Sequence, residues 1–398
     1  MELLRTPDPE TRAAFQGRAR EFLRYVGAHR DNPHQTTWGA YGNFDVYGLA
    51  LLAEGESDDE ARRFLSATLD MIDKNFADER ANPGNKWHLA DFAMHPLLRA
   101  YFQYRTTRFL DDPVWEHIAR TAQEFLFHYG DLSENHNFLH LTLRYLIGQT
   151  WPDATFVDGR KASVHVVEAR TGIRKWMRDW VTRGSAEWGS DIYYNVNLLS
   201  LLNLRDFAHE PEIQRAAEGV LDLMALDEAL DAFAGSWVGA ARRSYSVYRM
   251  DVRQSPARPL HYLWFNPPGV QEPFNLNFIG GVIQAATSDY LPPASIRWIA
   301  NHREPAENRA THVVGLFEGG KADHLSKHSL RLPEVMQSTM NAPGGGGRYT
   351  EHVWQVTMSE EALVFANHPT LSVEPGWGDR ARAVDETLAL YAGAPPAE

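Results

Sequence analysis

The chain of 398 residues contains no cysteine, which excludes disulfide bonds, thiolate metal sites and a cysteine nucleophile. It also has no run of basic residues, and its formal net charge is −13, so charge-driven binding to nucleic acid or an anionic membrane is not expected. No stretch approaches a membrane span, and the first residues lack the apolar core of an export signal. We expect a soluble protein, cytoplasmic as the sequence stands, and secreted or periplasmic if a signal has been removed.

Aromatic residues, in contrast, are abundant and include 12 tryptophans and 15 tyrosines. Most of these rings must fill the core. Tryptophan and tyrosine beside polar loops also suit a sugar-binding cleft, because they stack on pyranose faces and still form hydrogen bonds. The length and the hydrophobic share of 43% suit one large domain, alone or with a smaller one.

Up to about residue 305 the chain has the hydrophobic period of successive helices, separated by short stops. Amphipathic segments such as 57–76 alternate with more apolar ones such as 134–149, as in a ring of helical hairpins whose inner members are buried all round. We predict a mainly α protein with an (α/α) toroid catalytic domain over residues 1–305. The predicted helices are 9–27, 44–54, 57–76, 87–109, 112–129, 134–149, 161–182, 191–208, 210–233, 273–288 and 293–302.

From residue 306 the composition changes to that of β-strands. The segments THVVGLFEGG, HSLRLPEV, RYTEHVWQVTM and EALVFANHPTLSV have strand composition and alternation, and APGGGG interrupts them as a flexible break. We expect a short antiparallel β segment here, forming a small or truncated strand-rich region over residues 306–390.

Polar and aromatic residues gather at the starts of the more apolar helices, in HQTTWGAYGNFD, NPGNKWHLADF, SENHNF, SAEWGSDIYYN and EPFNLNF. If the inner helices run parallel, their N-terminal ends share one rim, and these clusters converge on one cleft. We assign substrate-binding roles to residues of the clusters and of the loop after helix 210–233. They are Trp38, Lys86, Trp87, His88, Glu134, Glu187, Trp188, Tyr194, Arg242, Tyr245 and Arg249.

One predicted helix opens with Glu134, Asn135, His136 and Asn137 side by side. Helix capping explains one or two polar residues, but not a carboxylate, two amides and an imidazole together. His136 and His140 share a helix face, a spacing that zinc sites use, but no third ligand can be nominated. We expect His140 in the core or behind the site, and we expect no metal or other cofactor.

Tyr193 and Tyr194 fall in the first turn of the predicted helix 191–208, where a hydroxyl can lie in the cleft. The loop after helix 210–233 supplies Arg242 and Arg243. Arginine is well suited to bind a sugar carboxylate because its planar fork donates two parallel hydrogen bonds.

These side chains match the requirements of β-elimination from a uronate. The C5 proton lies next to a carboxylate, so it can be removed only when the carboxylate charge is neutralised, for example by an asparagine amide with a histidine. A base then takes the C5 proton, and an acid protonates the leaving O4. Tyrosine can serve when neighbouring groups such as His136, Arg242 or Arg243 favour the phenolate.

The stretches ENHNFL with YLIGQTWPD, then SAEWGSDIYYNVNLLSLLNLRDFA, then a Gly/Arg/Tyr loop resemble the toroidal polysaccharide lyases, namely alginate, heparinase II/III-like and chondroitin/hyaluronate lyases. HVWQVTMSEEALVFANHP resembles the start of the β domain that usually follows the toroid. The resemblance implies that Asn135 neutralises the carboxylate and that His136 is a base or neutralising group. It implies Tyr193 as acid, or acid and base together, Arg243 as an auxiliary group, and Tyr194 as the alternative tyrosine. The implied partner is an acidic polysaccharide or oligosaccharide.

Two other functions stay open. A glycoside hydrolase of the (α/α) type needs two carboxylates across a cleft, and its candidates are Glu134 and Glu187, with Asp45 and Asp91 behind them. A non-catalytic carbohydrate-binding protein would instead use tryptophans as stacking platforms. Those tryptophans are Trp38, Trp87, Trp188 and Trp237.

Overall fold

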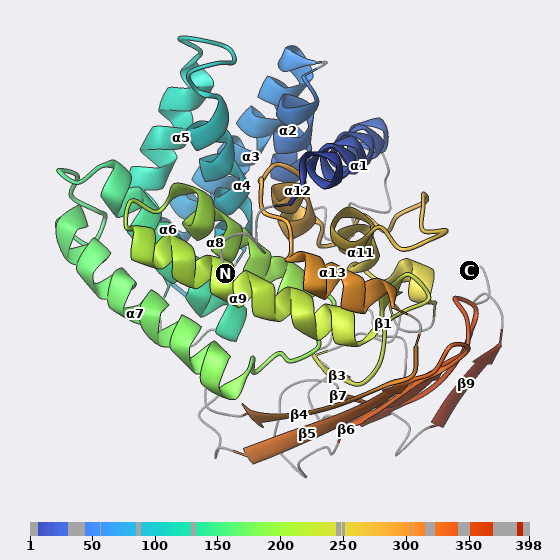
Figure 1. The fold of residues 1–398 in the computed structure, drawn as a ribbon. Helices are drawn as coiled ribbons and strands as arrows, with labels where there is room; N and C mark the ends of the chain where they lie inside the picture. The colour runs from blue at the N-terminus through green and yellow to red at the C-terminus, as the bar shows by residue number, and fades with distance from the viewer. Residues whose placement is uncertain are drawn as a thin grey trace.

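The computed structural model describes residues 7–30, 44–55, 57–84, 89–128, 133–243, 248, 251–302, 304–314, 323–340, 351–368 and 388–392. Across these residues the chain is mainly helical and ends in an antiparallel sheet (Figure 1). The predicted class, mainly α followed by antiparallel strands, is confirmed at this level. In Figure 1 the helices fill the upper part of the view and the curved sheet lies across its lower side.

Every predicted helical segment contains a helix, although the ends differ by several residues in places. The α-helices among the described residues are α1 (Pro9–Ala28), α2 (Phe44–Glu54), α3 (Asp58–Ala81), α4 (Ala90–Tyr104), α5 (Pro113–Gln123), α6 (Glu134–Thr150), α7 (Ala162–Arg183), α8 (Tyr193–Phe207), α9 (Pro211–Leu230), α11 (Arg258–Phe265), α12 (Gly280–Ala286) and α13 (Ala294–Asn301). A short 3₁₀ helix, η3 (Val252–Gln254), precedes α11.

Two helices differ from the prediction. Helix α12 is shorter than the predicted 273–288, because the backbone before it makes a tertiary contact instead: the amide of Phe274 donates to the hydroxyl of Tyr25 at 3.1 Å, and the same hydroxyl donates to the carbonyl of Phe274 at 3.2 Å. Helix α11 was not predicted. Its eight residues are almost all buried, so its sequence has no polar face to reveal a helical period.

The helices fall into two burial classes. Residues 193–204 of α8 are all buried, whereas α3 buries one face and exposes charged residues on the other. The more buried helices contact one another in the order α2, α4, α6, α8, α12, and α12 also contacts α2. The amphipathic helices α3, α7 and α9 pack against α2, α6 and α8, respectively. The predicted alternation of apolar and amphipathic helices therefore corresponds to a difference in packing.

The C-terminal sheet has the strand order β4-β5-β6-β7-β8-β9, with every pairing antiparallel. Strand β3, from the segment between α9 and α11, pairs with β7 and joins the helical part to the sheet. The sequence did not predict β6 or β9, whereas four predicted strand segments overlap β4, β5, β7 and β8. The strands are β1 (Ala232–Phe233), β2 (Ser236–Trp237), β3 (Ala241–Arg242), β4 (Ala306–Val314), β5 (Asp323–Arg331), β6 (Met336–Met340), β7 (Glu351–Thr357), β8 (Ala362–His368) and β9 (Leu388–Ala392).

The buried face of the sheet is polar where it meets the end of α9. Lys327 forms a buried ion pair with Asp231, and Arg331 donates to the carbonyls of Ala229 at 3.3 Å and Ile299 at 3.1 Å. The Ser338 hydroxyl accepts from a backbone amide just before β3 at 3.0 Å. Because buried polar groups need partners, these bonds set the position of the sheet against the loop that leads into β3.

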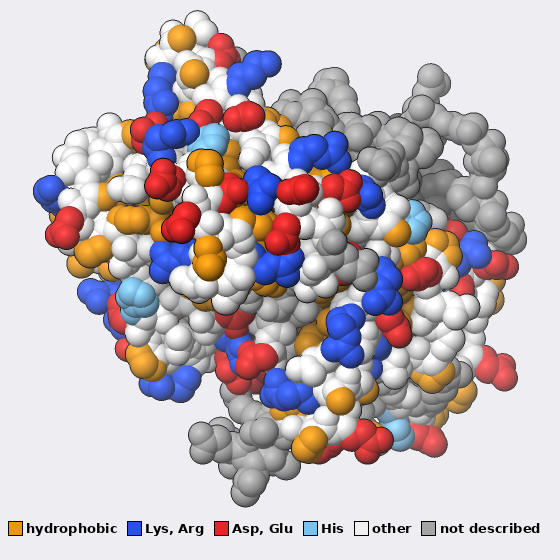
Figure 2. Space-filling view, turned by 90° about the horizontal axis from the view of Figure 1, so that it is seen from above, with side chains coloured by type: hydrophobic (Ala, Val, Ile, Leu, Met, Phe, Trp, Pro, Cys, Tyr) orange, Lys and Arg blue, Asp and Glu red, His pale blue; other side chains and the backbone are white. Residues whose placement is uncertain are grey.

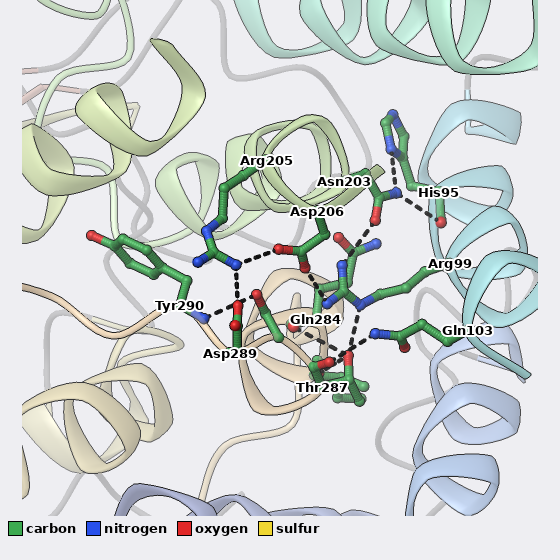
Figure 3. Close-up of polar contacts among 12 residues, drawn as sticks. His95, Arg99, Gln103, Asn203, Arg205, Asp206, Gln284, Thr287, Asp289 and Tyr290 are labelled. Carbon is green, nitrogen blue, oxygen red and sulfur yellow. Dashed lines mark hydrogen bonds and ion pairs between the residues drawn. The ribbon is translucent and has the colours of Figure 1, made fainter. Parts of the chain in front are cut away.

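A second polar cluster ties α4, α8 and α12 together near their C-terminal ends (Figure 3). The guanidinium of Arg99 is fully buried and donates to Asp206 at 2.6 Å, Asn203 at 3.2 Å and the Thr287 hydroxyl at 2.8 Å. The Gln103 amide donates to the Thr287 carbonyl at 2.9 Å. Three nitrogen atoms of one arginine in α4 thus donate hydrogen bonds to α8 and to the end of α12, so this cluster holds the three helices together.

No helix in the described part of the chain has both the length and the apolar character that crossing a membrane requires. Figure 2 shows acidic and basic side chains interspersed over the face seen from above, without a large area of one sign.

Candidate functional site

The polar start of α6 divides into capping and non-capping groups. The backbone amide of Asn137 donates to the carbonyl of Ser133 at 3.1 Å, and its side-chain amide donates to the same carbonyl at 3.0 Å. Asn137 therefore stabilises the first turn of α6. Glu134 and Asn135 are buried instead, at 2% and 0% exposure, although they lie in a first turn. Their polar groups point into the protein, and this calls for partners beyond the helix.

Arg243 is the group around which three other site residues meet. Its Nη1 donates to the Oδ1 of Asn135 at 3.1 Å and forms an ion pair with Glu187. Its guanidinium carbon lies 3.7 Å from the ring centroid of Tyr193, which is a close cation–π contact. The structure thus joins the start of α6, the segment before α8, the first turn of α8 and the residue after β3. Three of the four predicted catalytic residues belong to this cluster.

The backbone holds Arg243 in an uncommon conformation. Its φ of 46° lies in the left-handed region, which costs a non-glycine residue about 1–3 kcal/mol. The Arg243 carbonyl accepts from the Ser190 hydroxyl at 2.9 Å, and the preceding amide, of Arg242, donates to the Trp188 carbonyl at 2.7 Å. These bonds, with the pairing of β3 to β7, hold the guanidinium between Asn135 and Glu187.

The fourth predicted catalytic residue, His136, is held by α4. Its Nδ1 lies 2.7 Å from the Oδ2 of Asp91, and its ring stacks on Phe92 with centroids 4.8 Å apart and an angle of 10°. Phe92 in turn packs against a small buried group that includes Tyr193 and Leu139. Phe92 therefore links His136 to the buried group to which Tyr193 belongs. The His136 side chain is 14% exposed, whereas the Asp91 side chain is fully buried.

The charges beneath His136 are set by burial. Burial raises the pKa of Asp91, but the opposing effect of its neighbours, chiefly of His136, is larger, so the pKa of this carboxyl is lowered overall. Burial lowers the pKa of His140 to about 3 and that of His95 to about 4, so both are neutral at pH 7. The layer below the site is thus one carboxylate with neutral imidazoles.

His140 lies behind His136 and also faces the acid: its Nε2 is 3.8 Å from the Oδ2 of Asp91. Among the residues that the structure describes, no group of three or more histidines or acids is arranged to hold a metal ion. The sequence had placed His140 in the core or behind the site, and its side chain is 1% exposed.

The Glu134 side chain accepts hydrogen bonds from the segment before α8. Its Oε2 accepts from the Ser185 hydroxyl at 2.7 Å, the Ala186 amide at 2.6 Å and the Glu187 amide at 3.2 Å. Burial, with the charge of Glu187 as the next cause, raises the pKa of Glu134 to about 8. The carboxyl is therefore mostly protonated at pH 7, and it orients the backbone that carries Glu187.

Three residues predicted to bind substrate are buried and contact other parts of the protein. The Tyr194 hydroxyl donates to Asp227 at 3.1 Å, and burial, followed by the charge of Asp227, raises the pKa of this tyrosine. The Arg242 guanidinium donates to the carbonyl of Ala186 at 2.9 Å. Trp188 is 3% exposed and lies under the ammonium of Lys327, 5.5 Å from its ring centroid. These contacts are structural, and a substrate-binding role for the three stays a prediction.

Several predicted residues fall outside the described residues, so nothing is stated of their contacts. They are Trp38, Lys86, Trp87, His88, Tyr245 and Arg249, together with the side chain of Asp45.

Two clefts formed by described residues lie elsewhere. One, of about 340 Å³, lies between α1, α11 and the segment before α12. The other, of about 440 Å³, lies at the C-terminal ends of α4 and α8 and includes Arg205 and Asp289. Neither contains a predicted site residue. The candidate site is identified by its convergent side chains, not by the size of a cleft.

Sequence reasoning missed the part that Asp91 and Phe92 play. Asp91 had been weighed only as a hydrolase acid, and Phe92 had not been singled out. A signal existed, since Asp91 and His95 are four residues apart in an otherwise apolar helix and therefore share a face. Nothing in that spacing indicated which other helix the acid would meet.

Comparisons with known proteins add no identification. A scan of the chain against protein-family models finds no match, and searches of curated proteins and of solved structures find none either.

Proposed function

We propose that the protein is a polysaccharide lyase that cleaves a uronic-acid-containing polysaccharide by β-elimination. The observation that carries the proposal is the Arg243 cluster, in which one guanidinium contacts the Asn135 amide and the Tyr193 ring. His136 stacks on Phe92, which packs against the buried group that includes Tyr193. An amide, an imidazole, a phenol and a guanidinium are the groups that elimination from a uronate requires.

In this mechanism Asn135 and Arg243 bind the substrate carboxylate. Hydrogen bonds from the amide and the guanidinium neutralise its charge and stabilise the negative charge that develops on the acid group when the C5 proton leaves. Arg243 already bonds to Asn135 at 3.1 Å, so both donors can reach one carboxylate. The ion pair with Glu187, made by the same Nη1 atom, limits the movement of the guanidinium.

His136 and Tyr193 move the protons. Asp91 occupies the Nδ1 of His136, so the Nε2 atom is the one available to take the C5 proton. The C4–O4 bond then breaks, a C4=C5 double bond forms, and the leaving O4 takes a proton from the Tyr193 hydroxyl. The guanidinium against the ring favours the resulting phenolate. Tyr193 then regains a proton from solvent, and His136 releases the C5 proton to solvent.

We further propose that the helical part is an (α/α) toroid, with α2, α4, α6, α8 and α12 as its inner helices. Two observations support this arrangement: these helices contact one another in sequence, and α12 returns to α2. The amphipathic α3, α7 and α9 would form the outer layer. On this proposal, the starts of α6 and α8 share the rim at which the site lies.

The contacts do not favour the hydrolase alternative. A hydrolase needs its two carboxyl groups on opposite sides of a glycosidic bond. Here the Glu134 carboxyl instead accepts three hydrogen bonds from residues 185–187, and Glu187 forms an ion pair with Arg243. One oxygen of each carboxyl group is thus engaged in holding the site together.

The test is a panel of uronic-acid polysaccharides, with the ultraviolet absorbance of the new C4=C5 bond as the readout. Tyr193→Phe should abolish turnover while substrate binding persists. Tyr194→Phe is the matched control, because its hydroxyl bonds to Asp227, and it should retain turnover. Reducing ends that form without the absorbance, and with oxygen from labelled water, would identify a hydrolase instead. Equal activity of the Tyr193→Phe variant would refute the assignment of the acid.

A further inference from the structure

The candidate base, His136, is oriented by a fully buried carboxylate on another helix. Asp91 lies in the first turn of α4, and His136 in the first turn of α6. The Oδ1 of Asp91 accepts from the Phe92 amide at 2.9 Å, which turns Oδ2 toward the Nδ1 of His136 at 2.7 Å. The stacked ring of Phe92 fixes the plane of the imidazole. Both the direction and the tilt of the ring are therefore set by α4.

We infer that Asp91 is the positioning residue of the reaction, and that it fixes His136 as the tautomer with hydrogen on Nδ1 and a free lone pair on Nε2. The inference rests on the proposed function for its catalytic meaning, but the tautomer itself can be observed without any substrate. An ionised carboxylate only accepts hydrogen bonds, so the imidazole nitrogen that faces it must be the donor. The other nitrogen is then left as the acceptor.

The surrounding groups leave Asp91 ionised, and its Oδ2 faces His136. The lowered pKa of Asp91 keeps its negative charge at neutral pH. His140 lies 3.8 Å from the carboxylate, and His95 lies on α4 together with Asp91. Both histidines are neutral because burial lowers the pKa of each. When His136 takes a proton, the nearest negative charge is therefore the Asp91 carboxylate, which stabilises the imidazolium.

The decisive experiment is nitrogen-15 NMR of the imidazole rings at neutral pH, in the full chain without substrate. A His136→Gln variant identifies the His136 signals by their absence. The wild type should show hydrogen on Nδ1. In Asp91→Asn, the amide oxygen can keep the bond to the Phe92 amide, so the NH₂ group faces His136 and converts it to the tautomer with hydrogen on Nε2.

A matched control is Glu79→Gln, which makes the same acid-to-amide change beside another histidine. Glu79 lies 3.4 Å from the Nε2 of His128, and this change should leave the His136 signals unaltered. A wild-type His136 with hydrogen on Nε2, or an Asp91→Asn variant with an unchanged tautomer, would overturn the inference. The wild-type spectrum is decisive even if the Asp91→Asn variant fails to fold.

Steady-state kinetics of the wild type and of Asp91→Asn then test the positioning role of Asp91 separately from the lyase activity. With a cleaved uronan in hand, Asp91→Asn should lower kcat by about 10²- to 10⁴-fold with little change in KM, because the variant presents the wrong nitrogen to the C5 proton. If the tautomer switches but no uronan is cleaved by the wild type, the Asp91–His136 pair stands and the lyase proposal falls. If the wild type cleaves a uronan and Asp91→Asn retains full kcat, the positioning role is refuted.

Discussion

Replacing Glu134 by Gln should remove a large part of the pH dependence of stability. Burial beside Glu187 raises the pKa of Glu134 from 4.5 to about 8 in the folded protein. A group with a raised folded pKa contributes its full stability below its unfolded pKa, and that contribution is lost as the pH rises through the folded pKa. For Glu134 the loss therefore runs from about pH 4.5 to about pH 8.

The size of the effect follows from the shift. A rise from 4.5 to about 8 is 3.5 pH units, and at about 1.4 kcal/mol per unit the limit is about 5 kcal/mol of unfolding free energy. This is comparable to the whole stability of many domains, about 5–15 kcal/mol. Glutamine has the shape of the protonated acid, and its oxygen can accept the bonds from Ser185, Ala186 and the Glu187 amide.

Urea unfolding followed by tryptophan fluorescence, repeated at unit steps between pH 5 and 9, measures this difference. The variant should be only slightly more stable than the wild type at pH 5, just above the unfolded pKa, and increasingly more stable toward pH 9. Glu116→Gln, at an exposed position of α5, is the control and should give a difference that does not change with pH. A difference between Glu134→Gln and the wild type that is constant across the range would refute the reasoning.

Three further changes test the packing. Phe138→Ala should lower the unfolding free energy by about 3–5 kcal/mol, measured by the same urea titration, because the fully buried ring stacks on Trp176 with centroids 3.6 Å apart. Gly281→Ala should prevent stable folding, seen as loss of soluble protein, since the new Cβ would lie 1.8 Å from the Asn195 carbonyl oxygen. Gly219→Ala, where a Cβ meets nothing within 4 Å in α9, should instead raise the melting temperature, as alanine favours a helix by about 1 kcal/mol. Reversal of the order of the two glycine variants would contradict the packing between α8 and α12.

The local sequence pattern was sufficient to predict most of the helices, because helical periodicity depends on residues that are close together in the chain. Segment 57–76 repeats its apolar residues at helical spacing, and α3 occupies Asp58–Ala81. The same kind of information failed for α11, which is buried on nearly every side, and for β9, where a pairing with β8 decides the strand. Contacts with distant segments determine both elements.

The choice between Tyr193 and Tyr194 illustrates the limit at the site. Successive helical residues point about 100° apart, so the two rings must face different neighbours. Arg243 covers one ring, whereas Asp227 accepts the hydroxyl of the other. The sequence indicated a tyrosine in this turn but contained nothing to show which neighbours α8 would meet.

From the sequence alone came the mainly α class, the strand-rich end and the chemical types gathered at the start of α6, since composition and period are read along the chain. Only the tertiary structure decided that Arg243 meets Asn135 and Glu187, and that Asp91 meets His136. Those pairs are separated by between 45 and 108 residues. Their distances depend on how helices pack, and packing is a sum of many weak contacts that no short motif encodes.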